Sequence, residues 1–429
     1  MGAMSAASSH TASYYAATAN DATRYPALAG EATADVCVIG GGFSGLSTAI
    51  FLADRGAKVV LLEANRIGWG ASGRNGGQVL GGVTGDARLR AQLGEKGRRL
   101  LADLWYRGHD IIEERIRRFA IACDHKRGAL EAAVKPRHME GLQAFVEEFA
   151  RDHPDHQLRL LSKAQVRDAL GTDAYHGGMI DGRNAQVHPL NLALGEARGA
   201  ASLGVAIHEE SRVTSIQHGA RPVVETAHGR VTCGQVVLAG NAYHRLERQR
   251  LAGLLFPAGT YIIATEPLPE AVASRINRHD LAVCDSRIVL DYYRLTADRR
   301  LLFGGLCNYS NRAPADIAAA LRPRMLQIWP ELERTRIEYQ WGGEIGIVLS
   351  RVPLIGRSAP NVFFLEGYCG HGVNVTHLAS EIVADAMDGR SDRLEMFERA
   401  RQFKVPLGQW AGNQLLALGM AYYRVRDWL

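Results

Sequence analysis

Residues 35–63 constrain the fold more than any other part of the chain. A short apolar run, 36–39, is followed by the stretch Gly40-Gly41-Gly42-Phe43-Ser44-Gly45, and a second apolar run ends at Glu63. The pattern predicts a buried strand, a sharp glycine turn, a helix from Leu46 to about Asp54, and a second strand over 58–62. Such a unit is typical of one half of a parallel α/β sheet.

The three spaced glycines of this turn have separate physical roles. Gly40 permits the tight turn, Gly42 leaves room for a pyrophosphate against bare backbone, and Gly45 lets the helix pack closely on the strand. The helix N-terminus, at Phe43 and Ser44, presents free N–H groups to an anion. Glu63 ends the second strand, where its carboxylate would accept a hydrogen bond from a ribose hydroxyl. We predict a dinucleotide site; the alternative is a glycine-rich turn in an ordinary α/β core.

Length and composition limit the class of protein. A chain of 429 residues suggests two domains or one discontinuous pair, and 47% hydrophobic with 22% charged residues is typical of a soluble globular protein. The net charge of +5 is spread thinly, without a basic block interleaved with aromatics, so no nucleic-acid partner is expected. The cysteines show no metal-type spacing, and no secretory signal or long apolar run is visible, so we predict a cytoplasmic protein without a metal and without membrane association.

A second glycine-rich stretch follows the first unit. This stretch covers residues 66–78, and seven of its residues are small: 68, 70, 71, 72, 73, 76 and 77. Small residues build no core, but they let the backbone run close to a flat ligand. The alternative is a solvent loop. The candidate binding positions are Ala71, Ser72, Arg74, Asn75, Gly76, Gly77 and Gln78.

The rest of the chain alternates helical and strand patterns. Helices are predicted over 88–122, 139–152, 190–203, 316–328 and 376–387, with a capping box opening another at Ser162. Strands are predicted over 206–216, 223–226, 231–240, 261–265, 289–295, 300–304 and 361–367. Directly after the last strand stand Gly370-His371-Gly372-Val373-Asn374, which predict a second helix N-terminus able to meet an anionic ligand edge.

These three glycine motifs together resemble the D-amino-acid-oxidase-like (DAO) family of FAD enzymes. Four further stretches resemble the bacterial group of γ-glutamylputrescine oxidoreductases, to which L-pipecolate oxidases of lysine catabolism are similar. They are Ser13–Ala17, His188–Ala193, Leu290–Thr296 and Ala421–Tyr423. The resemblance covers the chain from residue 13 onward.

The resemblance implies bound FAD and its chemistry. The ADP half would lie on Gly40–Gly45 and Glu63, and the flavin ring between Ser72–Gln78 and Gly370–Asn374. In such enzymes a hydride passes from the carbon bearing nitrogen to flavin N5, and the imine hydrolyses to a carbonyl. Oxygen or another acceptor then takes the electrons. The implied FAD contacts also include Ala64, Val213, Gly240 and Gly343.

Departures from the family pattern change some of these expectations. Sarcosine oxidases attach flavin through a cysteine near the stretch 341–347, which contains none here, so we predict noncovalent FAD. Their carboxylate-binding lysine is replaced by Asn374, and the strand 300–304 lacks their oxygen-activating lysine. No lysine occurs anywhere between residues 164 and 403.

Five side chains are candidates for the chemistry. Glu344 follows two glycines beside the expected ring and would hold a substrate ammonium, unless it is merely an exposed carboxylate. His371 would tune the flavin charge or only shape the glycine loop. Tyr261 would contribute to an aromatic wall. An amino-acid substrate would instead need a cationic anchor, for which the candidates are Arg294 and Arg351.

The predicted fold is α/β, with a Rossmann-type FAD-binding domain interleaved with a mixed antiparallel-sheet substrate domain. We assign residues 35–85, 180–245 and 340–404 to the FAD-binding domain and 86–179 and 246–339 to the substrate domain. Residues 1–34 form an N-terminal extension and 405–429 a C-terminal helical tail.

The predicted function is oxidation of a C–N bond in a small amine of the γ-glutamylputrescine type, as in polyamine catabolism. Three alternatives stay open at this point. One is oxidation of L-pipecolate, a cyclic secondary amino acid. Another is a nicotinamide dehydrogenase, against which the second glycine turn argues. The last is a non-catalytic flavin-binding redox sensor or scaffold.

Overall fold

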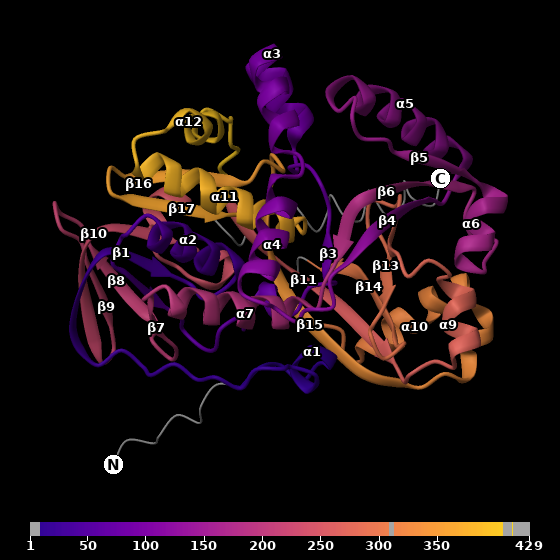
Figure 1. Ribbon diagram of the computed structural model, residues 1–429, viewed down its shortest axis with the longest axis horizontal. Helices are drawn as coiled ribbons and strands as arrows, with labels where there is room; N and C mark the ends of the chain where they lie inside the picture. The colour runs from indigo at the N-terminus through magenta and orange to yellow at the C-terminus, as the bar shows by residue number, and fades with distance from the viewer. Residues whose placement is uncertain (1–8, 309–312, 406–413, 415–429) are drawn as a thin grey trace.

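The structure, a computed structural model, describes residues 9–308, 313–405 and 414. Its strands form two sheets that lie side by side, the first on the left of Figure 1 and the second on the right. The mixed α/β class is therefore confirmed. The predicted C-terminal tail, with the stretch Ala421–Tyr423, lies outside the described residues. No helix in the described part of the chain is long and apolar enough to cross a membrane.

The first sheet is built around the predicted strand–turn–helix unit. Its strand order is β16-β17-β10-β1-β2-β7, and every neighbouring pair is parallel except β16 and β17. Strands β8 and β9 extend β10 as an antiparallel hairpin. The strands are β1 (Gly30–Ile39), β2 (Val59–Leu62), β7 (Ala206–His208), β8 (Val213–Gln217), β9 (Val223–Thr226), β10 (Gly229–Leu238), β16 (Leu354–Ala359) and β17 (Val362–Glu366).

Three long helices pack together beside this sheet, as Figure 1 shows. They are α2 (Phe43–Asp54), α7 (Pro189–Ser202) and α11 (Gly372–Met387), and α4 (Arg107–Arg118) contacts α11. Their small and aliphatic residues are buried almost throughout, because each helix lies between neighbours. The N-termini of helices α2 and α11 are therefore held in fixed positions.

The second sheet is mixed and longer. Its order is β15-β11-β14-β13-β12-β4-β6-β3, with β5 paired to β6, and only the pair β12–β4 is parallel. The strands are β3 (Gln78–Val79), β4 (Lys126–Ala133), β5 (Arg159–Ser162), β6 (Gly177–Gln186), β11 (Leu255–Thr265), β12 (Ala282–Asp285), β13 (Tyr292–Leu295), β14 (Leu301–Asn308) and β15 (Ile337–Val348).

One face of the second sheet is covered by a separate hydrophobic cluster. Its members include Leu130, Val283, Tyr293 and Trp329. Helices α6 (Lys163–Leu170), α9 (Glu270–Ile276) and α10 (Ile317–Ile328) supply the other side of this cluster. On the opposite face, α5 (Pro136–Asp152) packs on β4 and β6 through Leu142, Ala133 and Met179, and other strands of this sheet face the first sheet. The remaining elements are α1 (Tyr14–Ala17), η1 (Ala71–Gly73), α3 (Asp86–Leu104), η2 (Asn241–Tyr243), α8 (Arg248–Leu251), η3 (Pro330–Arg334) and α12 (Asp392–Glu398).

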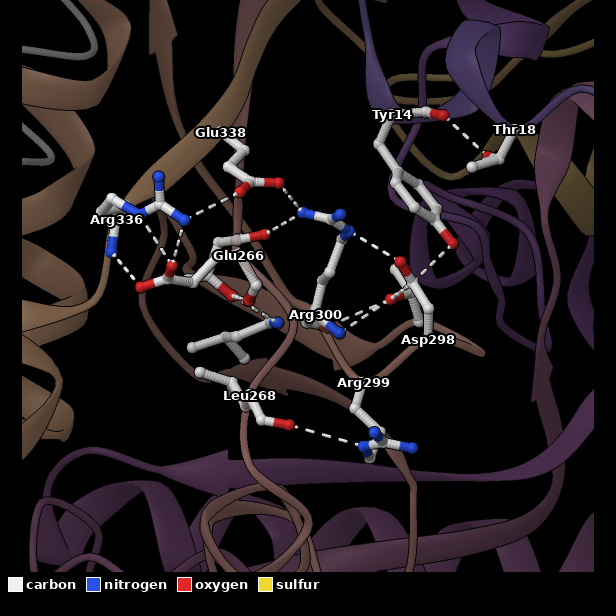
Figure 2. Close-up of polar contacts among 12 residues, drawn as sticks. Tyr14, Thr18, Glu266, Leu268, Asp298, Arg299, Arg300, Arg336 and Glu338 are labelled. Atoms are coloured by element: carbon white, nitrogen blue, oxygen red, sulfur yellow. Dashed lines mark hydrogen bonds and ion pairs between the residues drawn. The ribbon is translucent and has the colours of Figure 1, made fainter.

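The N-terminal segment contacts the second sheet through α1. The Tyr14 hydroxyl donates to Asp298 at 2.9 Å, and Arg300 donates to the same carboxylate at 2.7 Å and to Glu338. Figure 2 shows Arg300 lying between Asp298 and Glu338, with the Tyr14 ring approaching from α1. The neighbouring Tyr15 is fully buried against Trp341. The tyrosine pair therefore joins the N-terminal segment to β15 and to the hairpin of β13 and β14.

The sequence expectations and the structure differ at several elements. The stretch predicted as helical over 88–122 is helical over most of its length, but it forms two helices, α3 and α4, which meet at Trp105 and Tyr106. The strand predicted from 289 begins only at Tyr292, and β1 begins earlier, at Gly30, where its exposed half pairs with β10. The capping box is confirmed, since Ser162 and Gln165 bond each other reciprocally. Strands β6 and β15, which we grouped with the FAD-binding segments, pair in the second sheet; the domain boundaries stay a prediction.

Candidate functional site

One cavity of about 950 Å³ lies between the two sheets. The carboxyl ends of β1, β2 and β10 open onto it, as ligand sites in parallel α/β sheets do. The second sheet contributes residues of β11 to β15, and further parts of the wall come from the stretches 69–78 and 368–374. Two segments far apart in the sequence, the two glycine turns, thus face one space.

The first glycine turn is built as its spacing predicts. Gly40 has a φ of +118°, and a Cβ there would stand 2.7 Å from the carbonyl oxygen of Ala239 at the end of β10. A Cβ at Gly45 would collide with the Gly40 carbonyl. A Cβ at Gly42 would lie 2.7 Å from the Ser72 hydroxyl, which accepts from the Phe43 amide at 2.9 Å. The second glycine therefore also makes room for the neighbouring loop, a role that we had not assigned to it.

Glu63 ends β2 beside this turn. Its carboxylate accepts from the amides of Gly41 and Asn65, at 2.7 and 2.8 Å. Burial raises the pKa of Glu63, although both hydrogen bonds act the other way. Ala64, Arg212, Val213 and Gly240 line the same end of the cavity. The carboxylate is thus held rigidly at the place where the sequence predicts a ribose contact.

The predicted ring loop is held in shape by its own polar groups. The Asn75 amide donates to the carbonyls of Ala71 and Ser72 and accepts from the Gly77 amide. Arg74 donates to the Trp69 carbonyl at 2.7 Å and lies over the Trp69 ring. These contacts fix the loop before any ligand binds. Gly76 and Gln78 line the cavity, whereas Gly45 and Gly77 support the turns without forming its wall.

The second glycine turn places His371 at the N-terminus of α11. The His371 Nε2 donates to the Gly81 carbonyl at 3.0 Å, and burial lowers the pKa of the ring, so the imidazole is neutral at pH 7. Asn374 is buried, and its amide donates to the carbonyls of Gly82 and Trp105, both at 3.3 Å. Gly370, Gly372 and Val373 also line the cavity.

Glu344 and Arg351 both line the cavity, as two of the five candidates for the chemistry. The backbone of Glu344 bonds the Tyr243 hydroxyl through both its amide and its carbonyl, which fixes the strand at this point. Burial lowers the pKa of the Arg74 guanidinium, and the nearby Glu344 carboxylate acts in the opposite direction. Gly343, next to Glu344 in β15, lies against the Arg74 side chain, where a Cβ would come within 3.3 Å of the Arg74 Cβ. The Glu344 carboxylate therefore lies near enough to Arg74 for the two charges to interact.

Two other candidates do not reach the cavity wall. Tyr261 is buried beside Gly259 and Gly342. Arg294 is also buried and donates to the carbonyls of Gly76 at 2.9 Å and Val187 at 3.0 Å. Its remaining donors face the Leu295 carbonyl and the Tyr15 hydroxyl, both at 3.3 Å. We therefore no longer expect Arg294 to bind a substrate; it supports the ring loop from below.

Sequence reasoning missed several wall residues. Tyr243 follows the strand β10 in a stretch with no recognisable motif, and Cys284 and Thr260 are single residues of the second sheet. Their exposure to the cavity depends on which strands pair and in what register, and no local pattern encodes that. Among the described residues, no group of three or more His, Cys, Asp and Glu side chains is arranged to hold a metal ion.

The cavity fits a long, flat dinucleotide. Helices α2 and α11 both begin without a side-chain cap and without an acidic residue in the first turn, so their N-terminal amides favour an anion. The Ser44 and Tyr368 hydroxyls bond each other at 2.8 Å and hold the two N-termini together. The wall includes glycines 40, 42, 76 and 370, which have no side chains, so a ligand there can lie directly against the backbone. The residues present therefore fit FAD along the path that the sequence predicts.

The family of the chain follows from comparison with known proteins. Residues 35–386 match the family model DAO, described as FAD dependent oxidoreductase. The chain belongs to this family, and it is an FAD-dependent oxidoreductase of α/β fold. The alternatives of a nicotinamide dehydrogenase and of a flavin-binding protein without catalysis are thereby set aside.

Particular relatives extend the likeness over nearly the whole chain. Gamma-glutamylputrescine oxidoreductase of Escherichia coli (strain K12) is 40% identical over 97% of this chain and 98% of its own length. The probable oxidoreductase OrdL of Haemophilus influenzae is 38% identical over 97% of both chains. Among solved structures, glycine oxidase from Geobacillus kaustophilus superposes with a TM-score of 0.68 at 21% identity, covering 88% of this chain and 97% of its own. The likeness to glycine oxidase shows only that the two proteins share a fold.

Proposed function

We propose that this enzyme oxidises the C–N bond of a small amine of the γ-glutamylputrescine type, with noncovalent FAD as the electron acceptor. The observation that carries the proposal is the 40% identity to a protein of that name over nearly the full length of both chains, which includes the second sheet and not only the nucleotide fold. Strands β11 to β15 of the second sheet line the cavity, so likeness there bears on the substrate.

The wall beside the ring loop agrees with an alkyl chain. Tyr292 stands directly against Gly76, where a Cβ would lie 2.6 Å from the tyrosine ring. Cys284, Val289 and Leu290 continue this wall and leave it largely apolar. Burial of a chain of methylene groups there is favourable and excludes water from the reacting carbon.

The chain's own residues would divide the work with the cofactor. FAD supplies the acceptor for two electrons when it is bound. The ring loop and the N-terminus of α11 hold the ring, and Glu344 holds the substrate nitrogen by a charge-assisted hydrogen bond. The substrate loses a hydride and a proton to become an imine, and water then releases ammonia and leaves an aldehyde. Neutral His371 adds no positive charge of its own at the cavity.

A second candidate function is oxidation of L-pipecolate or a related cyclic amino acid. Arg351 favours it, because this exposed guanidinium lines the cavity and would pair with a substrate carboxylate. The same arginine would also suit the carboxylate of a γ-glutamyl group, so its presence alone does not decide between the two substrates.

Anaerobic bleaching of the flavin separates these functions. The FAD-loaded protein is mixed, without oxygen, with γ-glutamylputrescine, putrescine, spermidine, L-pipecolate, L-proline or sarcosine. We expect γ-glutamylputrescine to reduce the flavin at least ten times faster than the amino acids. Bleaching by L-pipecolate alone would exclude the amine proposal and support the second candidate.

A further inference from the structure

A buried charged cluster lies behind the cavity, among the packed helices α2, α4, α7 and α11 (Figure 1). Its members are Arg115 of α4, Glu196 of α7 and His377 of α11, and all three side chains are enclosed. Glu196 Oε1 accepts from Arg115 at 3.0 Å and lies 2.9 Å from the Nε2 atom of His377. None of the three lines the cavity, so the cluster acts there, if at all, through its charge.

Both ring nitrogens of His377 face oxygen atoms that accept. Nδ1 lies 2.7 Å from the Val373 carbonyl oxygen, one turn earlier in α11, and Nε2 faces the Glu196 carboxylate. The Thr376 hydroxyl, 3.2 Å from Nδ1, itself donates to the Val373 carbonyl. Although burial acts the other way, His377 and Arg115 hold the pKa of Glu196 below its ordinary value, so this carboxyl group is ionised. Each ring nitrogen therefore carries a proton, and His377 is an imidazolium.

His377 lies directly behind two residues of the cavity wall. Its ring is 5.4 Å from the ring of Phe43, which opens α2, and its Nδ1 bonds Val373 in the first turn of α11. Phe43 and Val373 both line the cavity. Within the described part of the chain, the side chains of Glu196 and Arg115 bond no residue of that wall. Of the three charges, the imidazolium is thus the one next to the cavity.

We propose that His377 raises the reduction potential of bound FAD by placing a buried positive charge behind the first turn of α11. Reduction by a hydride adds two electrons and one proton and leaves one negative charge on the ring, which a nearby cation stabilises. In the proposed arrangement this turn holds the ring, and neutral His371 brings no charge to it. The inference rests on the FAD chemistry of the family and holds for an amine and for an amino-acid substrate.

The size of the effect follows from Coulomb's law. Two unit charges about 12 Å apart, at an effective dielectric constant of about 20, change an equilibrium constant about tenfold. For a two-electron couple, a tenfold change is about 30 mV. Because the cluster is enclosed, salt in the solvent screens it little. Removal of the imidazolium should therefore lower the midpoint potential of bound FAD by about 30 mV.

The variant His377→Gln tests the assignment by potentiometry on FAD-loaded protein at pH 7. Sulfite is titrated separately, because its addition to an oxidised flavin also leaves a negative charge on the ring. We expect the equilibrium constant for reduction to fall about tenfold and the sulfite dissociation constant to rise by a similar factor. Only protein that retains FAD contributes to either value, so unfolding and cofactor loss do not imitate the result.

Glu196→Gln distinguishes an imidazolium from a neutral ring by the sign of its effect. With a charged His377, loss of the carboxylate leaves two buried cations side by side, so the ring gives up its proton. The potential then falls, by less than in His377→Gln, because an opposing negative charge is lost as well. With a neutral ring, the variant would remove only a negative charge, and the potential would rise. This variant decides the question alone if His377→Gln holds no FAD.

His109→Gln is the matched control. His109 of α4 is also buried and bonds Asn374 in the first turn of α11, but burial lowers its pKa to about 4, so it is neutral at pH 7. Its replacement removes no charge and should keep the equilibrium constant for reduction within about twofold of wild type. An unchanged potential in His377→Gln, a raised potential in Glu196→Gln, or an equal fall in His109→Gln overturns the proposal. None of these results bears on which substrate is oxidised.

Discussion

Replacement of Arg294 by methionine tests most sharply how the ring loop is held. The guanidinium is buried and donates to the Gly76 carbonyl at 2.9 Å and the Val187 carbonyl at 3.0 Å. Methionine keeps much of the volume but leaves both carbonyls without these donors. Each unsatisfied buried group costs about 1–3 kcal/mol, so the variant should lose about 2–6 kcal/mol of unfolding free energy.

The loss should extend to the cofactor, because Gly76 belongs to the loop that contacts it. We expect the FAD dissociation constant of Arg294→Met to rise at least tenfold, measured by recovery of flavin fluorescence. Once saturated with FAD, the variant should bind carboxylate-bearing ligands within about twofold of wild type, since Arg294 does not line the cavity. Urea unfolding with and without FAD reports the two stabilities.

Arg300→Met is the matched control. Arg300 lies on the same hairpin as Arg294 but bonds Asp298, Glu338 and the Thr265 carbonyl, away from the ring loop (Figure 2). It should leave FAD affinity unchanged. The reasoning is refuted if Arg294→Met keeps wild-type stability and FAD affinity while its affinity for carboxylate ligands falls tenfold, because Arg294 would then reach the substrate.

Four further predictions follow from the same geometry. Gly42→Ala should release FAD, seen as loss of flavin absorbance in the purified protein; if Ser72→Gly restores it, the clash is with the loop rather than with the pyrophosphate. FAD should remain in the supernatant after acid precipitation, and flavin in the pellet would contradict a noncovalent cofactor. Glu344→Gln should weaken amine binding about 10- to 100-fold in the reductive half-reaction, whereas a loss confined to Arg351→Ala would favour the amino-acid substrate. Burial lowers the pKa of His109 to about 4, below its unfolded value of 6.5, so protons bind the unfolded chain preferentially. The free energy of unfolding should therefore fall by about 1.4 kcal/mol per pH unit from pH 6.5 down to 4. If a urea-midpoint series shows that His109→Gln keeps the full slope, His109 is not the cause.

The cofactor side of the site was predictable because its signals are local. The turn through Gly40 and Gly45 and the acid at Glu63 stand within one strand–helix–strand unit, where spacing and hydrophobic period decide the geometry. The second glycine turn at 370–372 follows the same logic. A sequence pattern of this kind predicts both the local structure and the class of ligand.

The substrate side was not predictable, because it depends on strand register. Arg294 lies in a stretch that resembles the family, yet its side chain turns to the carbonyls under the ring loop rather than to the cavity. Cys284 carries no motif, and it reaches the cavity wall only because β12 pairs with β4 on one side and β13 on the other. The helical prediction over 88–122 missed the break between α3 and α4, because the apolar stripe continues across Tyr106.

A single-turnover reaction tests the central claim most directly. FAD-loaded protein is mixed anaerobically with an equimolar amount of γ-glutamylputrescine, and the bleached flavin and the carbonyl product are measured in the same sample. Oxidation of the C–N bond predicts that aldehyde and ammonia appear in amounts equal to the flavin reduced. A flavin that stays oxidised, or bleaches without an aldehyde, would contradict the account.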